Sequence, residues 1–481
     1  MNNGARTWKP KKHSNPIFMS LSFLIVFFIF FVFYQEISTF ILPHSTISIS
    51  SQFPQCAVKS VEKFLWYAPH SGFSNQLSEF KNAILMAAIL NRTLIVPPVL
   101  DHHAVALGSC PKFRVLDPNE IRLKVWDHVI DLVSEGRYVS MARIIDLSSV
   151  ASLVQTIDFR RFVSQWCGVD LNSICSTDSS IQRSSLNNLR KCGSLLSGFQ
   201  GNVDKCLHAV NVDCRTKVWT YQENALDGAL DSFQPDEQLK MKKKFSYVRY
   251  RQDVYKNLGP GSEAHLSTVL AFGSLFSSQY KGSQLYIDID IKKLPRNHEM
   301  QSLFGKIEFM PFVPDIIEAG KEFVQKNIGA PFLCTQLRLL DGQFKSHWKP
   351  TFSVLKQKVE VVKKGSSHPI HIFVMTDLPR SNWSSCYLGE LANKTSSFKL
   401  HVLSDGEELV KRTAAKVGAA YDGSKDSHCP HQLPNVLLFV EETVCSCASL
   451  GFVGTAGSTI AENIELMRKN NVCVDNYEIG V

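Results

Sequence analysis

The sequence lacks the features that mark several common classes of protein. It has no internal repeat and no low-complexity tract, which excludes solenoid and disordered chains. It has no Cys-x-x-Cys pair, so a structural zinc site is disfavoured. No dense run of Lys and Arg is interleaved with aromatic residues, and a net charge of only +8 indicates anionic small molecules rather than nucleic acid as partners. With 481 residues, the chain is long enough for two domains.

Charge is also missing from one segment near the N-terminus. Residues 17–34 are apolar and rich in Phe, and as a helix they are just long enough to cross a bilayer core. Four basic residues precede this segment, and none follows it before Lys59. We therefore predict a cytoplasmic tail at 1–16, a transmembrane anchor at 17–34 and a lumenal remainder, as in a single-pass type II membrane protein. A cleaved signal peptide is the alternative, but it normally has a shorter apolar core and a small-x-small cleavage site.

Two features of the remaining chain agree with a lumenal location. Acceptor sequons for N-glycosylation begin at Asn91, Asn382 and Asn393. All 13 cysteines follow the predicted anchor, and their odd number leaves at least one thiol free. We predict a disulfide-stapled insert from the cluster of Cys167, Cys175, Cys192, Cys206 and Cys214.

After a Ser- and Thr-rich stem at 35–57, the pattern changes to that of an α/β domain. The apolar residues 64–67 predict a strand, and a Gly-containing turn at 69–75 follows. Apolar residues at helical spacing then predict a helix over 76–91, and a second strand over 93–96 ends at two prolines. We assign 58–310 to an N-terminal, acceptor-side Rossmann-like domain that contains the Cys-rich insert.

A second series of alternating strands and helices begins near residue 331. Alternation of this kind is typical of a parallel, doubly wound sheet. We therefore assign 311–481 to a C-terminal Rossmann-like domain and predict an α/β protein whose two domains face a cleft. The strands are predicted at 332–339, 370–377, 398–403 and 451–454, and the helices at 352–364, 407–417, 435–447 and 458–469.

Ligands of doubly wound sheets bind at the carboxyl ends of the strands, which makes the first Gly-containing turn a candidate site. Gly72 lets the backbone approach a ligand, and Ser74 and Asn75 can cap the helix that follows. A helix N-terminus binds anions readily. The alternative is an ordinary tight turn before a capped helix.

The second domain offers three further candidates. Arg338 lies on an otherwise apolar strand, and its guanidinium fork matches phosphate oxygens; a structural pair with Asp341 or another carboxylate is the alternative. Asp377 ends a strand and can accept from ribose or guanine, or can cap the next helix. The backbone amides and hydroxyls of 454–459 suit a diphosphate.

At these positions the sequence resembles the GDP-fucose protein O-fucosyltransferase superfamily, in particular its plant members. Residues 72–76 and 91–98 resemble a G-x-F-G-N-Q loop that leads to an N-R-T-L-x-V-P-P strand. Leu337-Arg338 resembles an H-L-R strand, and 373–377 resembles a strand that ends in Thr-Asp. Residues 452–459 resemble an F-x-G-x-x-x-S-S/T nucleotide loop.

The resemblance implies a GT-B fold and an inverting transfer of fucose from GDP-fucose without a metal ion or other cofactor. Arg338 would hold the diphosphate and assist the departure of GDP, and Asn75 would lie near the sugar. Asp377 and the hydroxyls that follow the last strand would hold guanosine. The implied nucleotide-sugar-binding residues are Gly72, Phe73, Asn75, Arg338, Asp377, Ser458 and Thr459.

Three positions depart from the family pattern. Gly72 and Ser74 stand where the family often has Arg and Gly, and Gln336 stands where the strand often has His. These departures leave the donor sugar and the mechanism open. His70 precedes the Gly loop and is a candidate catalytic base, since imidazole titrates near neutrality; a surface His without a role is the alternative.

The sequence thus predicts a glycosyltransferase with its catalytic domain in the lumen of the Golgi or the ER. Its partners are a nucleotide-sugar donor and a protein or glycan acceptor. Two other functions fit the same residues. One is a catalytically silent lumenal binding or scaffold protein, and the other is a transferase that uses another nucleotide-deoxyhexose donor.

Overall fold

The structure is a computed structural model that describes residues 56, 62–101, 116–212, 217–220, 230–233, 247–275, 298–340, 342–365, 369–419, 429 and 432–474. The chain divides into two compact units, Met1–Pro54 and Gln55–Val481, and every described residue belongs to the second. Within these ranges, no helix is long and apolar enough to cross a membrane. The predicted tail and anchor, and the predicted stem apart from Cys56, lie outside the described residues.

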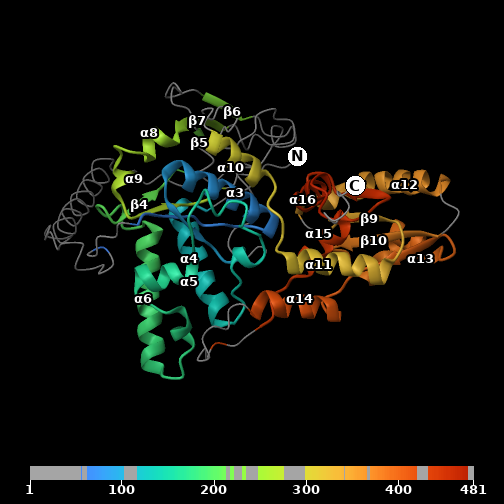
Figure 1. Ribbon diagram of the computed structural model, residues 1–481, viewed down its shortest axis with the longest axis horizontal. Coiled ribbons are helices and arrows are strands. Elements are labelled where there is room, and N and C mark those ends of the chain that lie inside the picture. The colour runs from blue at the N-terminus through green and yellow to red at the C-terminus, as the bar shows by residue number, and fades with distance from the viewer. Residues whose placement is uncertain are drawn as a thin grey trace, which may run out of the picture. The chain divides into compact units, whose positions relative to one another are not determined.

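The first sheet has five parallel strands in the order β3-β2-β1-β8-β4. Helix α3 (Phe73–Leu90) connects β1 to β2, the two strands of this sheet that were predicted from the sequence. Figure 1 shows this part of the chain in blue and green. The strands are β1 (Phe64–Trp66), β2 (Thr93–Val96), β3 (Thr156–Asp158), β4 (Leu207–Val210) and β8 (Val269–Phe272).

The second sheet has four parallel strands in the order β11-β10-β9-β12. Both sheets therefore carry the doubly wound order in which the chain reverses direction beside its first strand. The prediction of an α/β protein with two parallel, doubly wound sheets is confirmed. The strands are β9 (Phe332–Leu337), β10 (Ile370–Thr376), β11 (Phe398–His401) and β12 (Gly451–Gly454).

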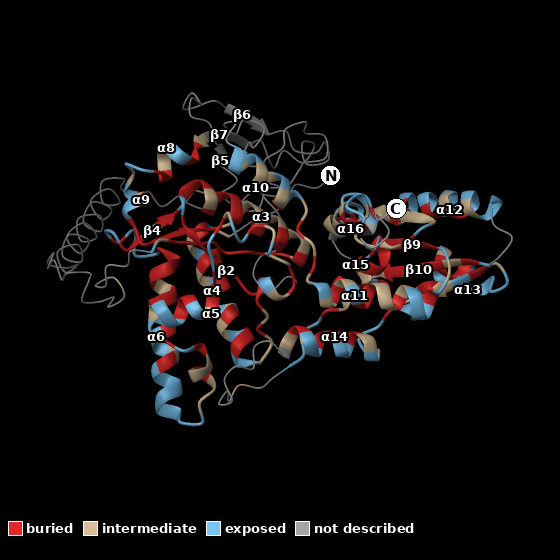
Figure 2. Cartoon of the chain, in the orientation of Figure 1, coloured by how far each residue is buried: buried red, intermediate tan, exposed pale blue. Residues whose placement is uncertain are grey.

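Helices cover both faces of the second sheet, because side chains alternate between faces along a strand. Ile372 and Val374 of β10 belong to one apolar cluster with Leu355 of α12 (Trp348–Lys364). Phe373 of β10 points to the other face, where its ring lies 5.6 Å from that of Phe323 in α11 (Pro314–Phe323). Figure 2 shows the strands as mostly buried and the outer helix faces as exposed.

The remaining elements surround these two sheets. A third, three-stranded sheet has the order β5-β7-β6. Its strands are β5 (Lys217–Thr220), β6 (Leu230–Phe233) and β7 (Tyr247–Asp253). The other α-helices are α4 (Pro118–Ser134), α5 (Phe159–Phe162), α6 (Ser179–Ser197), α8 (Val254–Leu258), α9 (Glu263–Leu266), α10 (His298–Glu308), α13 (Tyr387–Asn393), α14 (Glu408–Ala419), α15 (Leu437–Ser446) and α16 (Thr459–Lys469).

An aromatic cluster connects the two sheet regions within this unit. The Phe73 ring at the start of α3 lies 4.4 Å from that of Phe439 in α15 and 6.2 Å from that of Phe312. All three side chains are buried. The start of α3 is therefore packed directly against the second sheet region.

The disulfides differ in part from the predicted stapled insert. Cys167 pairs with Cys192 inside the insert, but Cys175 and Cys206 pair with distant partners, Cys429 and Cys56. The sequence left the pairing open, because proximity in sequence does not determine which cysteines meet in the fold, and Cys214 lies outside the described residues. Two further disulfides, Cys334–Cys445 and Cys447–Cys473, fix α15, and Cys386 is a free thiol.

Candidate active site

A cavity of about 880 Å³ lies at the carboxyl ends of strands from both sheets. The loop after β1 and the loop after β2 line one side of it, and the ends of β9 and β10 line another. The starts of α15 and α16 complete the lining. A doubly wound sheet binds its ligand at the carboxyl ends of its strands. In this protein the carboxyl ends of both sheets line the same cavity.

Two helix N-termini open into this cavity. Helix α3 begins at Phe73, with Gly72 as the preceding residue, and α16 begins at Thr459 after Ser458. Neither end has a side-chain cap. The prediction that Ser74 and Asn75 cap α3 was wrong, because the helix begins before them. Uncapped helix N-termini carry partial positive charge, and their backbone amides can bind an anion.

Arg338 lines the same cavity and lies one residue beyond the end of β9, not within the strand. Its guanidinium carbon is 4.7 Å from the centre of the Phe344 ring, a cation–π distance. The side chain is half-buried, so water at the cavity lowers the cost of its charge. Asp341, the carboxylate considered as its structural partner, lies outside the described residues.

The backbone of Arg338 is held by a buried threonine. The Arg338 amide donates to Thr455 Oγ1 at 2.9 Å, and this hydroxyl donates to the Gln336 carbonyl at 3.2 Å. Thr455 is fully buried. It therefore fixes the end of β9 to the loop between β12 and α16, which contains part of the predicted nucleotide loop.

Asp377 holds the backbone of the two residues that follow Arg338. Its Oδ1 accepts from the Leu339 amide at 2.8 Å, and its Oδ2 accepts from the Leu340 amide at 2.9 Å. Thr376 Oγ1 donates to the Leu337 carbonyl at 2.8 Å. The Thr-Asp pair lines the cavity but also holds the loop that carries Arg338. Each carboxylate oxygen accepts one backbone amide and keeps a further lone pair, which can accept from a ligand in the cavity.

The other predicted binding residues are distributed around the cavity. Gly72, Phe73, Asn75 and Thr459 line it, whereas Ser458 is fully buried and does not. Among the described residues, Ser458 Oγ has no hydrogen-bond partner. Ser458 directly precedes Thr459, the first residue of α16, which does line the cavity.

His70 is fully buried and does not line the cavity. Its Nδ1 lies 2.9 Å from Ser71 Oγ, and its Nε2 lies 2.8 Å from Ser274 Oγ. Burial lowers the pKa of His70 to about 4, so the ring is neutral near pH 7. With both nitrogens bonded inside the protein, His70 cannot reach an acceptor hydroxyl, and it is not the surface residue of the alternative interpretation either.

Sequence reasoning missed several polar residues of the cavity. Asp101 and Arg137 line it from the first sheet region, and Glu441 lines it from α15. Burial, together with the nearby Asp405 and Glu442, raises the pKa of Glu441 to about 8. The carboxyl-end rule would have found Asp101, which follows β2 and the two prolines after it. Glu441 gave no such signal because it lies on a helix.

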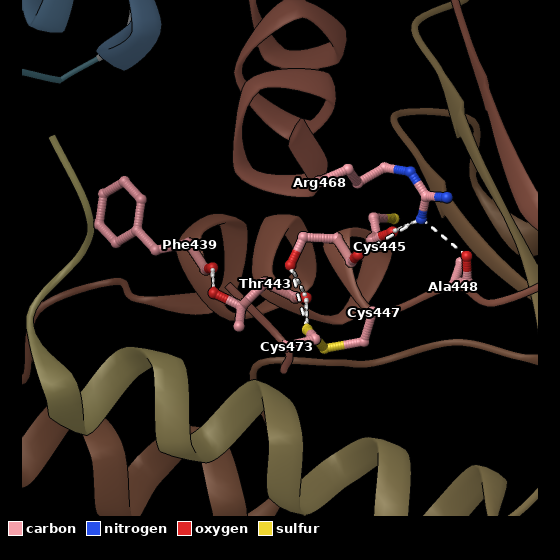
Figure 3. The surroundings of a disulfide bond; sticks show 8 residues. Phe439, Thr443, Cys445, Cys447, Ala448, Arg468 and Cys473 are labelled. Carbon is pink, nitrogen blue, oxygen red and sulfur yellow. Dashed lines mark hydrogen bonds between the residues drawn. A yellow bond between two sulfur atoms is a disulfide. The ribbon is translucent and has the colours of Figure 1, made fainter. Parts of the chain in front are cut away.

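The helix that carries Glu441 is anchored at its opposite end. Arg468 Nη1 donates to the carbonyls of Cys445, Ser446 and Ala448, with its shortest bond, 2.7 Å, to Ala448. The Cys447–Cys473 disulfide lies beside this group, as Figure 3 shows. A cation at the carboxyl end of a helix complements its dipole. The N-terminal end of α15, which lines the cavity, is thereby held in place.

Comparison with known proteins agrees with this description. The chain is 54% identical to O-fucosyltransferase 30 of Arabidopsis thaliana over 497 aligned positions, which cover 97% of each chain. No family model matches the chain. Among solved structures, POFUT1 in complex with GDP is 13% identical, with a TM-score of 0.38 over 85% of this chain and 96% of that one. NodZ from Bradyrhizobium is 10% identical, with a TM-score of 0.36 over 85% and 94%.

Proposed function

This chain belongs to the O-fucosyltransferase family, and we propose that it transfers fucose from GDP-fucose to a hydroxyl group of a protein or glycan. The observation that carries the proposal is the joint placement of Arg338 and two uncapped helix N-termini around one cavity. This arrangement suits the diphosphate of a nucleotide sugar.

The same groups fit the chemistry of the transfer. When the sugar–phosphate bond breaks, negative charge grows on the departing diphosphate. A guanidinium and backbone amides fixed in advance stabilise that charge more in the transition state than in the ground state. Thr455 and Asp377 supply this fixed geometry, because they hold the backbone of Arg338 and of the two residues after it. No step of this account requires a metal ion.

In this proposal Asp377 shares the predicted guanosine contacts with Thr459 and Glu441, which line the cavity. Among the described residues, Glu441 has no hydrogen-bond or ion-pair partner. Its carboxyl group is protonated near neutral pH, so it can donate to an acceptor atom of a nucleobase and accept from one N–H group through its carbonyl oxygen. Asn75, at the start of α3, is left to contact the sugar.

We further propose inversion at the sugar and a Golgi location for a single-pass protein whose catalytic region is lumenal. An inverting transfer needs only one displacement, so one acceptor and one leaving group must share the cavity. The lumenal location is supported by the five disulfides, which persist in oxidising compartments. The asparagines of all three sequons are exposed, as glycosylation requires.

A donor panel tests the proposal. Thermal unfolding of the full chain is followed with GDP-fucose, other GDP- and UDP-sugars and a nucleotide-rhamnose donor. We expect the largest rise in Tm with GDP-fucose, because stabilisation follows affinity, and a smaller rise for Arg338→Ala. A larger rise with another deoxyhexose donor would favour the alternative transferase. Binding without turnover would favour the silent relative.

A further inference from the structure

Three carboxyl side chains line the cavity, and they differ in what they already bind. Both oxygens of Asp377 accept backbone amides. Glu441 lies on α15 in the second sheet region. Asp101 follows β2 of the first sheet region. Only Asp101 lies on the side predicted to receive the acceptor.

The carboxylate of Asp101 is held by one oxygen. Its Oδ2 accepts from Arg137 Nη1 and lies 3.6 Å from His128 Nε2. Arg137 also donates to Glu135, so the guanidinium itself is fixed. Among the described residues, Asp101 Oδ1 has no partner, and the side chain is 44% exposed. One oxygen is therefore anchored, while the other can accept a proton.

The backbone before Asp101 is fixed to the Gly loop by one buried side chain. Gln76 Nε2 donates to the Ser71 carbonyl at 2.8 Å and to the Leu100 carbonyl at 2.9 Å. Its Oε1 accepts from the Leu100 amide at 2.9 Å. Gln76 is fully buried. This amide ties the residue before Asp101 to the loop that leads into α3, which carries Asn75, so the two sides of the reacting centre are positioned together.

Resting on the proposed function, we propose that Asp101 is the catalytic base that accepts the proton of the acceptor hydroxyl. The acceptor oxygen bonds to the anomeric carbon as the bond from that carbon to the diphosphate oxygen breaks. The hydroxyl proton passes to Asp101 Oδ1, and GDP leaves with the electron pair of the broken bond. Gln76 is a positioning residue for this step.

The other titratable groups near the cavity suit this role less well. His70 is buried behind the Gly loop, with both ring nitrogens bonded. Glu441 has a raised pKa of about 8. Near neutral pH it therefore already holds a proton and cannot take another from the acceptor hydroxyl. Arg137 orients Asp101 and keeps its positive charge.

The test separates proton removal from the other functions of the cavity by using two nucleophiles. GDP release from GDP-fucose is measured with the full chain in water alone and with added sodium azide. Attack by water requires loss of a proton, whereas azide forms fucosyl azide without any proton transfer. We expect Asp101→Asn to lower the water reaction by about 100-fold or more and to leave the azide reaction close to wild type. Asp178→Asn, which changes a carboxylate that caps α6, leaves both rates unchanged.

Several results would overturn the assignment. These are an unchanged water reaction in Asp101→Asn, an equal loss of both reactions, or a selective loss of the water reaction in Glu441→Gln instead. Wild-type protein that releases GDP with neither nucleophile overturns the proposed function, and the base with it. For Gln76→Leu we expect a KM for azide close to that of wild type and a lower kcat for the water reaction. This is the result expected of a positioning residue.

Discussion

Asp377 accepts a hydrogen bond from the backbone amide of Leu339 at 2.8 Å. This contact ties the end of β10 to the loop after β9, which carries Arg338. The second oxygen binds the next amide of the same loop. The carboxylate that was predicted to bind the nucleotide therefore also holds the loop that carries Arg338.

Replacing Asp377 by Asn should weaken GDP binding. One oxygen becomes an NH₂ group that faces a backbone amide, so the loop loses a hydrogen bond and gains a repulsive contact. Loss of a bond to a charged group costs about 1–3 kcal/mol, which corresponds to a rise in Kd of roughly 5- to 150-fold. Calorimetric titration with GDP measures it, with Asp178→Asn as the matched control. An unchanged Kd would contradict the assigned role.

Thr455 provides a second test of the same loop. Thr455→Val keeps the shape of the side chain but removes the bond that the Arg338 amide donates to the hydroxyl, while the Gln336 carbonyl keeps its bond from the Thr455 amide. A buried group left without its hydrogen bond costs about 1–3 kcal/mol. We expect the valine variant to lose most transferase activity and Thr455→Ser to keep it. Equal activity of the two variants would show that the hydroxyl does not position Arg338.

Ser71 adopts a backbone conformation that favours glycine, with φ at 66°. Its hydroxyl lies 2.9 Å from His70 Nδ1, and its carbonyl accepts from Gln76. A side chain in the left-handed region costs about 1–2 kcal/mol. Both variants lose the hydroxyl contact, but Ser71→Gly removes the backbone cost, whereas Ser71→Ala keeps it. Chemical denaturation should therefore find Ser71→Ala less stable than Ser71→Gly, and the reverse order would refute the argument.

Glu442 predicts a dependence of stability on pH. The side chain is fully buried, and burial raises its pKa from 4.5 to about 8, against the opposing bond from Asn463. The folded protein therefore keeps a proton that the unfolded chain releases between these values. As the pH rises through this window, the Glu442 contribution lowers the free energy of unfolding by roughly 1 kcal/mol per pH unit.

Glu442→Gln removes this ionisation while keeping the shape of the side chain. The variant should match wild type near pH 4.5 and exceed it increasingly as the pH approaches 8. Urea denaturation at several pH values measures the difference. A difference that does not change with pH would mean that Glu442 is ionised in the folded protein.

The sequence predicted the elements in which a long apolar run ends at a turn. β2 has the predicted bounds, and β10 and β12 differ from theirs by at most one residue. β3 was missed because only Ile157 of its three residues is apolar. Short strands of this kind form because neighbouring strands offer backbone partners, and a local pattern cannot show this.

The sequence predicted which residues lie at the candidate site more fully than it predicted what each of them does. Arg338, Asp377 and the Gly loop line one cavity, as the carboxyl-end rule requires. The rule could not show that Asp377 binds backbone amides, because a carboxylate accepts from a ligand and from an amide equally well. The burial of His70 was equally hidden, since it depends on Ser274, 204 residues away.

GDP release from GDP-fucose by the purified full chain tests the central claim most directly. In the presence of an acceptor, wild-type protein should release GDP and form a fucosylated product of inverted configuration. Arg338→Ala should lose about 100-fold or more of this rate while it unfolds at a Tm close to wild type. Full activity of Arg338→Ala, or no GDP release by wild-type protein with any acceptor, would contradict the account.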